Sequence, residues 1–302
     1  MELHNTRCAI CRTEGNCTEL YPANFSPEDF SPAVFSARRL PDRIHYRMVR
    51  CSGCGLVRSD PVGDLDLVAK LYQQSTFDYT TEVENLAGTY GSYLARLDRH
   101  GVDRGSILEI GCGNGFFLTQ ARAQGYREVA GVEPSEAAIQ SAPAGIRAGI
   151  RCAMMGPGLF PENSFDVICL FQVLDHIFQP LELLETCHSI LKPNGFLLCL
   201  NHNVESLSAR LMKDRSPIID IEHTYLYSLA TMGKLAAAAG FAVTESGKVR
   251  NRYSLSYLMR LVPMPVALKK AALAGLRATG LGRVPMRVPL GNLYMIAQRV
   301  ED

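Results

Sequence analysis

The chain has 302 residues, of which 47% are hydrophobic and 20% charged, and its formal net charge is +1. This length allows one large domain and a small one, and the composition excludes a disordered or fibrous protein. We expect a cytoplasmic protein with reduced cysteines, because the sequence shows neither a signal peptide nor an uncharged apolar run of the roughly 18 residues that a membrane span needs.

Two Cys-x-x-Cys pairs lie near the start of the chain, separated by a long spacer. Four thiolates can complete a tetrahedral zinc shell with no open position, which is a structural arrangement. Gly53 and Gly55 allow the backbone to turn tightly at the second pair. We therefore predict a zinc-binding module over residues 1–61, whose ligands are Cys8, Cys11, Cys51 and Cys54.

Two other interpretations of these cysteines stay open. They are buried or incidental thiols in one, and a redox pair in the other, although thioredoxin-like proteins use a single pair in a βαβ context. Cys17, His4 and His45 are nearby residues that could replace a ligand.

A helical pattern over residues 65–72 follows the cysteine pairs and leads along the chain toward Leu94 and Leu97. It predicts a helical lead-in over residues 62–100. The main domain is then expected over residues 101–302.

A glycine-rich turn at residues 111–115 follows a short apolar strand over 107–110 and precedes a predicted helix over 116–124. Glycine lets a ligand approach the backbone where a β-carbon would collide. Glu109 stands at the carboxyl end of the strand, where open α/β sheets bind ligands. A second strand, over 129–133, ends in Glu133, whose carboxylate could accept hydrogen bonds from both hydroxyls of a ribose. The turn is therefore predicted to bind a nucleoside or dinucleotide cofactor.

Glu109, Gly111, Gly113, Gly115 and Glu133 resemble the first two motifs of the class I S-adenosylmethionine-dependent methyltransferases, in which an acidic residue precedes G-x-G-x-G. Further segments, over 163–170, 171–177 and 191–196, are similar to the fourth strand, the loop after it and the turn before the fifth strand of that family. The resemblance implies an α/β fold with a doubly wound, Rossmann-like sheet of seven mostly parallel strands, the last one antiparallel. Strands over 241–248 and 292–300 would be the final two.

The resemblance also implies which residues bind S-adenosylmethionine. Glu109 and the glycine turn with Cys112 would face its amino-acid part, Glu133 and Pro134 its ribose, and Gln172 its sulfonium side. Met154 stands where many relatives have an aspartate that contacts the adenine. The expected cofactor residues are Glu109, Gly111, Cys112, Gly113, Gly115, Glu133, Pro134, Met154 and Gln172.

Several side chains follow the fourth and fifth predicted strands, where the methyl acceptor should bind. Asp175, His176 and Tyr227 are the less favoured candidates, and His176 is expected to order a loop. His223 and Tyr225 resemble a recurrent His-x-Tyr segment of these enzymes, and a histidine that caps the helix over 229–239 is the alternative. The expected catalytic residues are His223, Tyr225 and His202.

Residues 246–300 carry ten Lys and Arg and no Asp or Glu, which leaves an excess of acidic residues in the rest of the chain. Within this segment, residues 266–279 predict a moderately amphipathic helix. We expect a helical insertion over about 250–290, before the last strand. It could cover the pocket, contact an anionic membrane surface, recognise the phosphates of a nucleotide-linked substrate, or simply cover the sheet edge.

Three functions are compatible with these patterns. The first is S-adenosylmethionine-dependent methyl transfer to a small-molecule acceptor, such as a sugar or a precursor of a polysaccharide or lipid, by an enzyme with one structural zinc ion. The second is methylation of RNA held by the zinc module, although residues 1–61 lack the basic, aromatic-rich stripe that favours nucleic acid. The third is an interaction protein without catalysis. The oligomeric state is not predicted.

Overall fold

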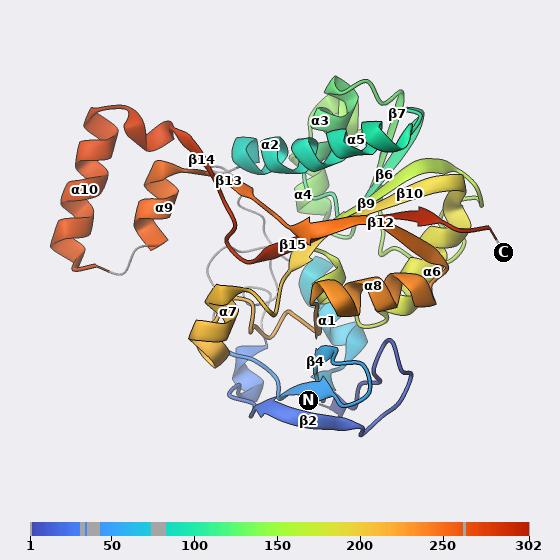
Figure 1. Cartoon of the computed structure of the whole chain (residues 1–302), viewed down its shortest axis with the longest axis horizontal. Coiled ribbons are helices and arrows are strands. Elements are labelled where there is room, and N and C mark those ends of the chain that lie inside the picture. The colour runs from blue at the N-terminus through green and yellow to red at the C-terminus, as the bar shows by residue number, and fades with distance from the viewer. Residues whose placement is uncertain (1, 31–33, 35–42, 74–82, 262–263, 302) are drawn as a thin grey trace.

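The computed structural model describes residues 2–30, 34, 43–73, 83–261 and 264–301 (Figure 1). Parts of the expected zinc module (31–33 and 35–42), of the lead-in (74–82) and of the insertion (262–263) lie outside the described residues. The boundaries of the three expected segments stay predictions.

The centre of the molecule is a sheet that, in the described residues, has seven strands in the order β12-β15-β10-β9-β6-β7-β8. β15 runs antiparallel to both of its neighbours, β10 and β12, and the other strand pairs of this sheet are parallel. The predicted fold class is therefore confirmed. The strands are β6 (Ser106–Ile110), β7 (Glu128–Glu133), β8 (Ile150–Cys152), β9 (Phe165–Phe171), β10 (Leu191–His202), β12 (Phe241–Lys248) and β15 (Asn292–Arg299).

Helices cover both faces of this sheet, which is why β9 and β10 are apolar along most of their length. On one face, α2 (Val83–Leu94) and α3 (Phe116–Ala123) enclose a cluster that includes Tyr90, Phe117 and Leu198. On the other face, α6 (Pro180–Ile190) and α8 (Leu229–Ala238) pack on a second cluster. The other described α-helices outside the insertion are α1 (Leu65–Gln73), α4 (Glu136–Gln140), α5 (Ala144–Arg147) and α7 (Leu207–Met212).

The N-terminal region forms a smaller sheet in the order β11-β4-β3-β2. Its strands β2 (Cys17–Tyr21), β3 (Met48–Cys51) and β4 (Val57–Ser59) come from the predicted zinc module, but β11 (Tyr225–Leu226) comes from the main domain. A separate pair joins β1 (Leu3–His4) to β5 (Val62–Gly63). The small sheet therefore joins the predicted zinc module to the main domain through the β4–β11 pair.

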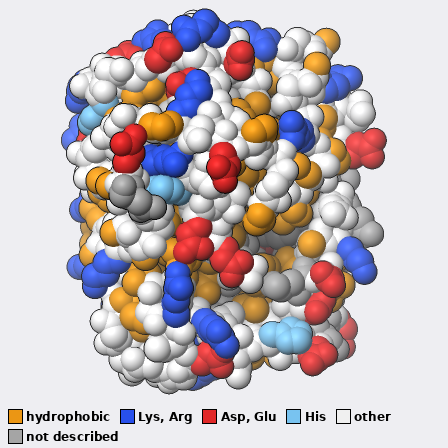
Figure 2. Space-filling view, turned by 90° about the vertical axis from the view of Figure 1, so that its right-hand side faces the viewer, with side chains coloured by type: hydrophobic (Ala, Val, Ile, Leu, Met, Phe, Trp, Pro, Cys, Tyr) orange, Lys and Arg blue, Asp and Glu red, His pale blue; other side chains and the backbone are white. Residues whose placement is uncertain are grey.

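The expected insertion lies between β12 and β15 and projects from the body at the left of Figure 1. It consists of a hairpin, β13 (Asn251–Ser254) with β14 (Pro285–Val288), that carries α9 (Leu255–Leu261) and α10 (Val266–Ala278). None of the described helices is long and apolar enough to cross a membrane. On the opposite side, which carries the C-terminus, basic and acidic side chains are interspersed (Figure 2).

Candidate functional site

The glycine turn between β6 and α3 has a backbone that only glycine adopts readily. Gly111, Gly113 and Gly115 have φ angles of 70°, 53° and 69°. A β-carbon on Gly111 would lie 2.5 Å from Val173, and one on Gly115 would lie 2.7 Å from Ile146. The turn is fixed beside β7, since the amides of Gly111 and Cys112 donate to the carbonyl of Val132.

Glu133, at the end of β7, is buried against this turn. Its two carboxylate oxygens accept hydrogen bonds from the amides of Gly113 and Ser135, each at 2.9 Å. Burial raises its pKa, and the two amides oppose that shift without cancelling it. The carboxylate is therefore held in one orientation at the edge where the strands end, in the place predicted for it.

Three buried oxygen atoms near the ends of β6 and β9 have no hydrogen-bond partner in the described part of the chain: Glu109 Oε2, Asn114 Oδ1 and Gln172 Oε1. All three are acceptors, and Ile110 and Leu170 are direct neighbours on adjacent strands, so the strand ends that carry them meet at one edge. Burial, with the charge of Glu133, holds the pKa of Glu109 well above its usual range. A buried edge with acceptors and too few donors fits the amino group of S-adenosylmethionine.

Two residues of the expected cofactor set are placed differently from the rest. The Cys112 side chain is buried in the core, and a β-carbon on Gly131 would lie 2.5 Å from its sulfur, so only its backbone borders the turn. Met154 is 49% exposed and follows β8, where the amide of Ala153 donates to the carbonyl of Glu133. Pro134 follows Glu133 directly at the same edge. Asn114 was missed, although it stands inside the glycine motif.

Three histidines gather at the neighbouring strand ends. The His223 ring lies between those of His176 and His202, with ring centroids 4.8 Å from each. His202 is the last residue of β10, and its amide donates to the carboxylate of Asp175 at 3.1 Å. Burial raises the pKa of Asp175 to about 6, although His202 acts to lower it. The structure therefore brings together His202 and His223, which the sequence places 21 positions apart, with Asp175 and His176.

His223 is buried, and its Nδ1 lies 2.9 Å from the carbonyl oxygen of Ile218. A carbonyl has no proton to donate, so Nδ1 carries the hydrogen. Burial holds the pKa of His223 well below its usual range, and the neighbouring His176 and His202 lower it further. The ring is therefore neutral, with a lone pair on Nε2.

The small sheet fixes the segment that carries His223. Ser59 of β4 makes two hydrogen bonds to this segment. Its amide donates to the carbonyl of Thr224 at 2.8 Å, and its hydroxyl donates to the carbonyl of His223 at 2.9 Å. The Tyr225 hydroxyl donates to the carbonyl of Arg7 at 2.7 Å, and that of Tyr227 to the carbonyl of Leu174. Sequence reasoning missed Ser59, because a two-residue strand pair has no periodicity to detect.

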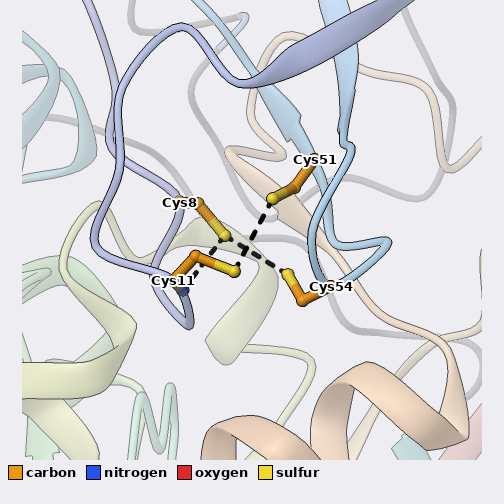
Figure 3. Close-up of side chains that lie close together, drawn as sticks. All are labelled: Cys8, Cys11, Cys51 and Cys54. Carbon is orange, nitrogen blue, oxygen red and sulfur yellow. Dashed lines mark hydrogen bonds between the residues drawn. The ribbon is translucent and has the colours of Figure 1, made fainter.

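The four predicted cysteine ligands meet in one cluster (Figure 3). The ligand atoms all lie within 4.8 Å of one another, with Cys8 and Cys54 sulfurs 3.4 Å apart and those of Cys11 and Cys51 3.8 Å apart. A tetrahedral zinc ion with bonds of about 2.3 Å separates its sulfur ligands by about 3.8 Å. All ten cysteines of the chain are free thiols. The cluster is therefore compatible with a zinc ion.

The thiols of this cluster differ in acidity. Burial raises the pKa of Cys8 to about 11. At Cys51 burial acts in the same direction, but hydrogen bonds from the amides of Cys54 and Gly53 and from the thiols of Cys8 and Cys54 together lower the pKa to about 7. One thiol is thus close to ionisation at neutral pH, and thiolate is the form that binds zinc.

Comparison with known proteins shows the family to which the main domain is similar. A family model described as a methyltransferase domain matches residues 83–246. A ubiquinone biosynthesis O-methyltransferase of Caulobacter vibrioides is 34% identical over 131 residues, which are 38% of this chain and 50% of that protein. A protein of Mycolicibacterium smegmatis with the name "Probable S-adenosylmethionine-dependent methyltransferase" is 28% identical over 141 residues, which are 46% of this chain and 53% of that protein.

A solved structure of an S-adenosylmethionine-dependent methyltransferase from Mesorhizobium loti superposes with a TM-score of 0.49 at 19% identity. The match covers 72% of this chain and 100% of that one. The chain spans about half the length of the curated relatives it matches. The family model, in contrast, covers more than half of this chain, and the chain therefore belongs to the methyltransferase-domain family, among the class I S-adenosylmethionine-dependent methyltransferases.

Proposed function

We propose that the protein transfers a methyl group from S-adenosylmethionine to a small-molecule acceptor. The observation that carries this proposal is one shared edge of the sheet. Buried acceptor oxygens that have no donor among the described residues lie near the ends of β6 and β9, and a neutral histidine lies beyond the ends of β9 and β10. A cofactor held by the first group would present its methyl group toward the second.

The cofactor residues have separate roles in this proposal. Glu109, Asn114 and Gln172 accept hydrogen bonds from the amino group, which lies against the backbone of Gly111, Cys112, Gly113 and Gly115. Glu133 faces the ribose, with Pro134 beside it, and the exposed Met154 borders the adenine by packing. When bound, the cofactor supplies an electrophilic methyl group on its sulfonium. The residues then need only hold the acceptor atom behind that group.

His223 is the proposed general base. Its Nε2 lone pair can take the proton of an acceptor hydroxyl, because Nδ1 is already committed to the carbonyl of Ile218. His202 orients the His223 ring from the other side, since its Nδ1 is held by Asn292 at 3.1 Å. Tyr225 fixes the segment through its bond to Arg7.

The acceptor is proposed to be a small molecule with a hydroxyl group, such as a sugar or a precursor of a polysaccharide or lipid. Relatives named as O-methyltransferases support an oxygen acceptor. A hydroxyl loses its proton during transfer, which gives the neutral His223 a task. We further propose that the cysteine cluster holds one structural zinc ion, which leaves the chemistry to the main domain.

The first test is calorimetric titration with S-adenosylhomocysteine, on protein whose zinc content is measured, beside a Gly113→Arg variant. We expect one-to-one binding that the variant loses, because an arginine side chain at this turn would occupy the cofactor's place. If folded, zinc-loaded protein binds no S-adenosylhomocysteine, the proposed function is wrong and an interaction role takes its place.

The second test addresses His223 after a screen of hydroxyl acceptors with radiolabelled cofactor. His223→Gln should lower turnover by about 100-fold or more while the affinity for S-adenosylhomocysteine stays the same. His4→Gln is the matched control, since His4 lies on the exposed strand β1. Equal turnover in the three proteins would remove His223 from the mechanism.

A further inference from the structure

A cavity of about 340 Å³ lies apart from the cofactor turn, between the end of α2 and the base of the insertion. Ser92, Tyr93 and the helical turn after α2 line one side, and residues next to or within the β13–β14 hairpin line the other. Cavities of this size are large enough for small ligands. Four of the lining side chains are arginines: Arg96, Arg99, Arg250 and Arg287. We call it the arginine cavity.

Most of this positive charge is not neutralised by the residues that the structure describes. Arg96 bonds to Glu245 and donates to the Tyr294 hydroxyl at 2.7 Å. Arg99, Arg250 and Arg287 form no salt bridge with any carboxylate in the described part of the chain, although the charge of Arg99 acts on Glu245 from a distance. Three guanidinium groups thus line the cavity without a contacting counter-charge from the described residues.

The hairpin adds a further like charge. Arg287 of β14 is directly opposite Arg252 of β13, and residues in that position share one face of the strand pair. Arg252 lies against α2, where a β-carbon on Gly88 would come within 3.0 Å of its guanidinium. Like charges directly opposite destabilise a strand pair. A bound anion would offset this repulsion.

The arginine cavity adjoins the acceptor side of the sheet. Arg96 contacts Tyr294, which is on the same face of β15 as Asn292, about 7 Å away at two residues of strand. Asn292 is directly opposite His202 on β10 and contacts its ring. The insertion therefore leaves the sheet where the proposed acceptor binds.

We propose that the arginine cavity binds the phosphate or diphosphate group of a small phosphorylated ligand. Guanidinium groups bind phosphate oxygens in pairs, and three of them suit a ligand with two or more negative charges. Identifying this ligand as the methyl acceptor rests on the proposed function, whereas anion binding by the cavity does not.

The test is calorimetric titration of the full chain with inorganic pyrophosphate at fixed ionic strength. The variant is Arg250→Gln with Arg287→Gln. The matched control is Arg277→Gln with Arg283→Gln, which removes the same charge from exposed positions of the same insertion outside the cavity. We expect pyrophosphate to bind the wild type and the control alike, and the cavity variant at least tenfold more weakly, with unchanged S-adenosylhomocysteine binding.

Two results would overturn this inference. One is pyrophosphate binding that is absent, or that both double variants weaken equally, since the charge would then act without a site. The other is binding to phosphatidylglycerol vesicles that exceeds pyrophosphate binding and depends equally on both pairs of arginines, which would assign the segment to a membrane surface. A wild type that binds pyrophosphate but no S-adenosylhomocysteine would instead contradict the proposed function and leave the proposed anion site unaffected.

Discussion

The residues proposed to bind the cofactor come from one stretch of chain, 109–133, and from a few positions at neighbouring strand ends. The acceptor side is assembled from four distant segments: β4, the loop after β9, the end of β10, and residues 218–227. The first region depends on backbone angles that local sequence specifies. The second depends on tertiary contacts, above all on β11 of the main domain, which pairs with β4 of the predicted zinc module. Damage to the module should therefore affect the acceptor side and spare the cofactor turn.

The largest effect is expected from Cys51→Ser. Removing one of four ligands should abolish zinc binding and lower the free energy of unfolding by roughly 5 kcal/mol or more. Elemental analysis and urea unfolding measure these changes, and hydrogen exchange should show lost protection at Tyr225 and Leu226. Cys17→Ser, outside the cluster, should behave as the wild type. If S-adenosylhomocysteine binding disappears together with zinc, the two regions are not separable.

The next effect concerns Asp175, whose buried carboxyl keeps its proton to about pH 6 in the folded state against a usual value near 3.8. Its contribution to stability is full below about pH 4 and is lost as the pH rises through 6. Relative to Asp175→Asn, the wild type should lose about 3 kcal/mol of unfolding free energy over this range.

Urea unfolding at pH 4, 5, 6 and 7 tests this prediction. Asp103→Asn, on the exposed surface, shows what removal of any carboxylate does. Parallel pH profiles for the wild type and Asp175→Asn would mean that the carboxyl is not buried as described.

A smaller effect is expected at the cofactor turn from Gly115→Ala. The positive φ and the contact with Ile146 should cost about 2 kcal/mol of unfolding free energy. Gly275→Ala is the control, because Gly275 is inside α10 with open space around it and should gain about 0.5 to 1 kcal/mol. A gain in unfolding free energy from Gly115→Ala, equal to that from Gly275→Ala, would contradict the described turn.

The smallest effect is expected from Ser59→Ala, which removes the hydroxyl that bonds to the carbonyl of His223. Unfolding free energy should fall by about 1 kcal/mol, the usual contribution of one buried hydrogen bond. Ser52→Ala, at an exposed position of the same module, should leave stability unchanged. A fall equal to that of Cys51→Ser would show that this bond, rather than the metal, holds the module.

Sequence patterns predicted the main sheet well because each signal is local. The glycines predict the turn after β6, and continuous apolar runs predict β6 and β9. The spacing of the two cysteine pairs likewise predicted that their four sulfur atoms lie close together, as they do in the cluster. Patterns did not predict the β4–β11 pair, the position of His176 beside His223, or the arginine cavity, since these arise from packing between segments remote in sequence.

The pairing of β4 with β11 also determines when the small sheet can be completed during synthesis of the chain. Ser59 and His223 are 164 residues apart, so the small sheet stays incomplete until most of the chain has been made. At a synthesis rate of about 5 to 20 residues per second, the edge of β4 waits on the order of 10 to 30 seconds for its partner. During that interval the four cysteines can already come together. A bound metal ion would then keep the unpaired edge of β4 from pairing with other chains.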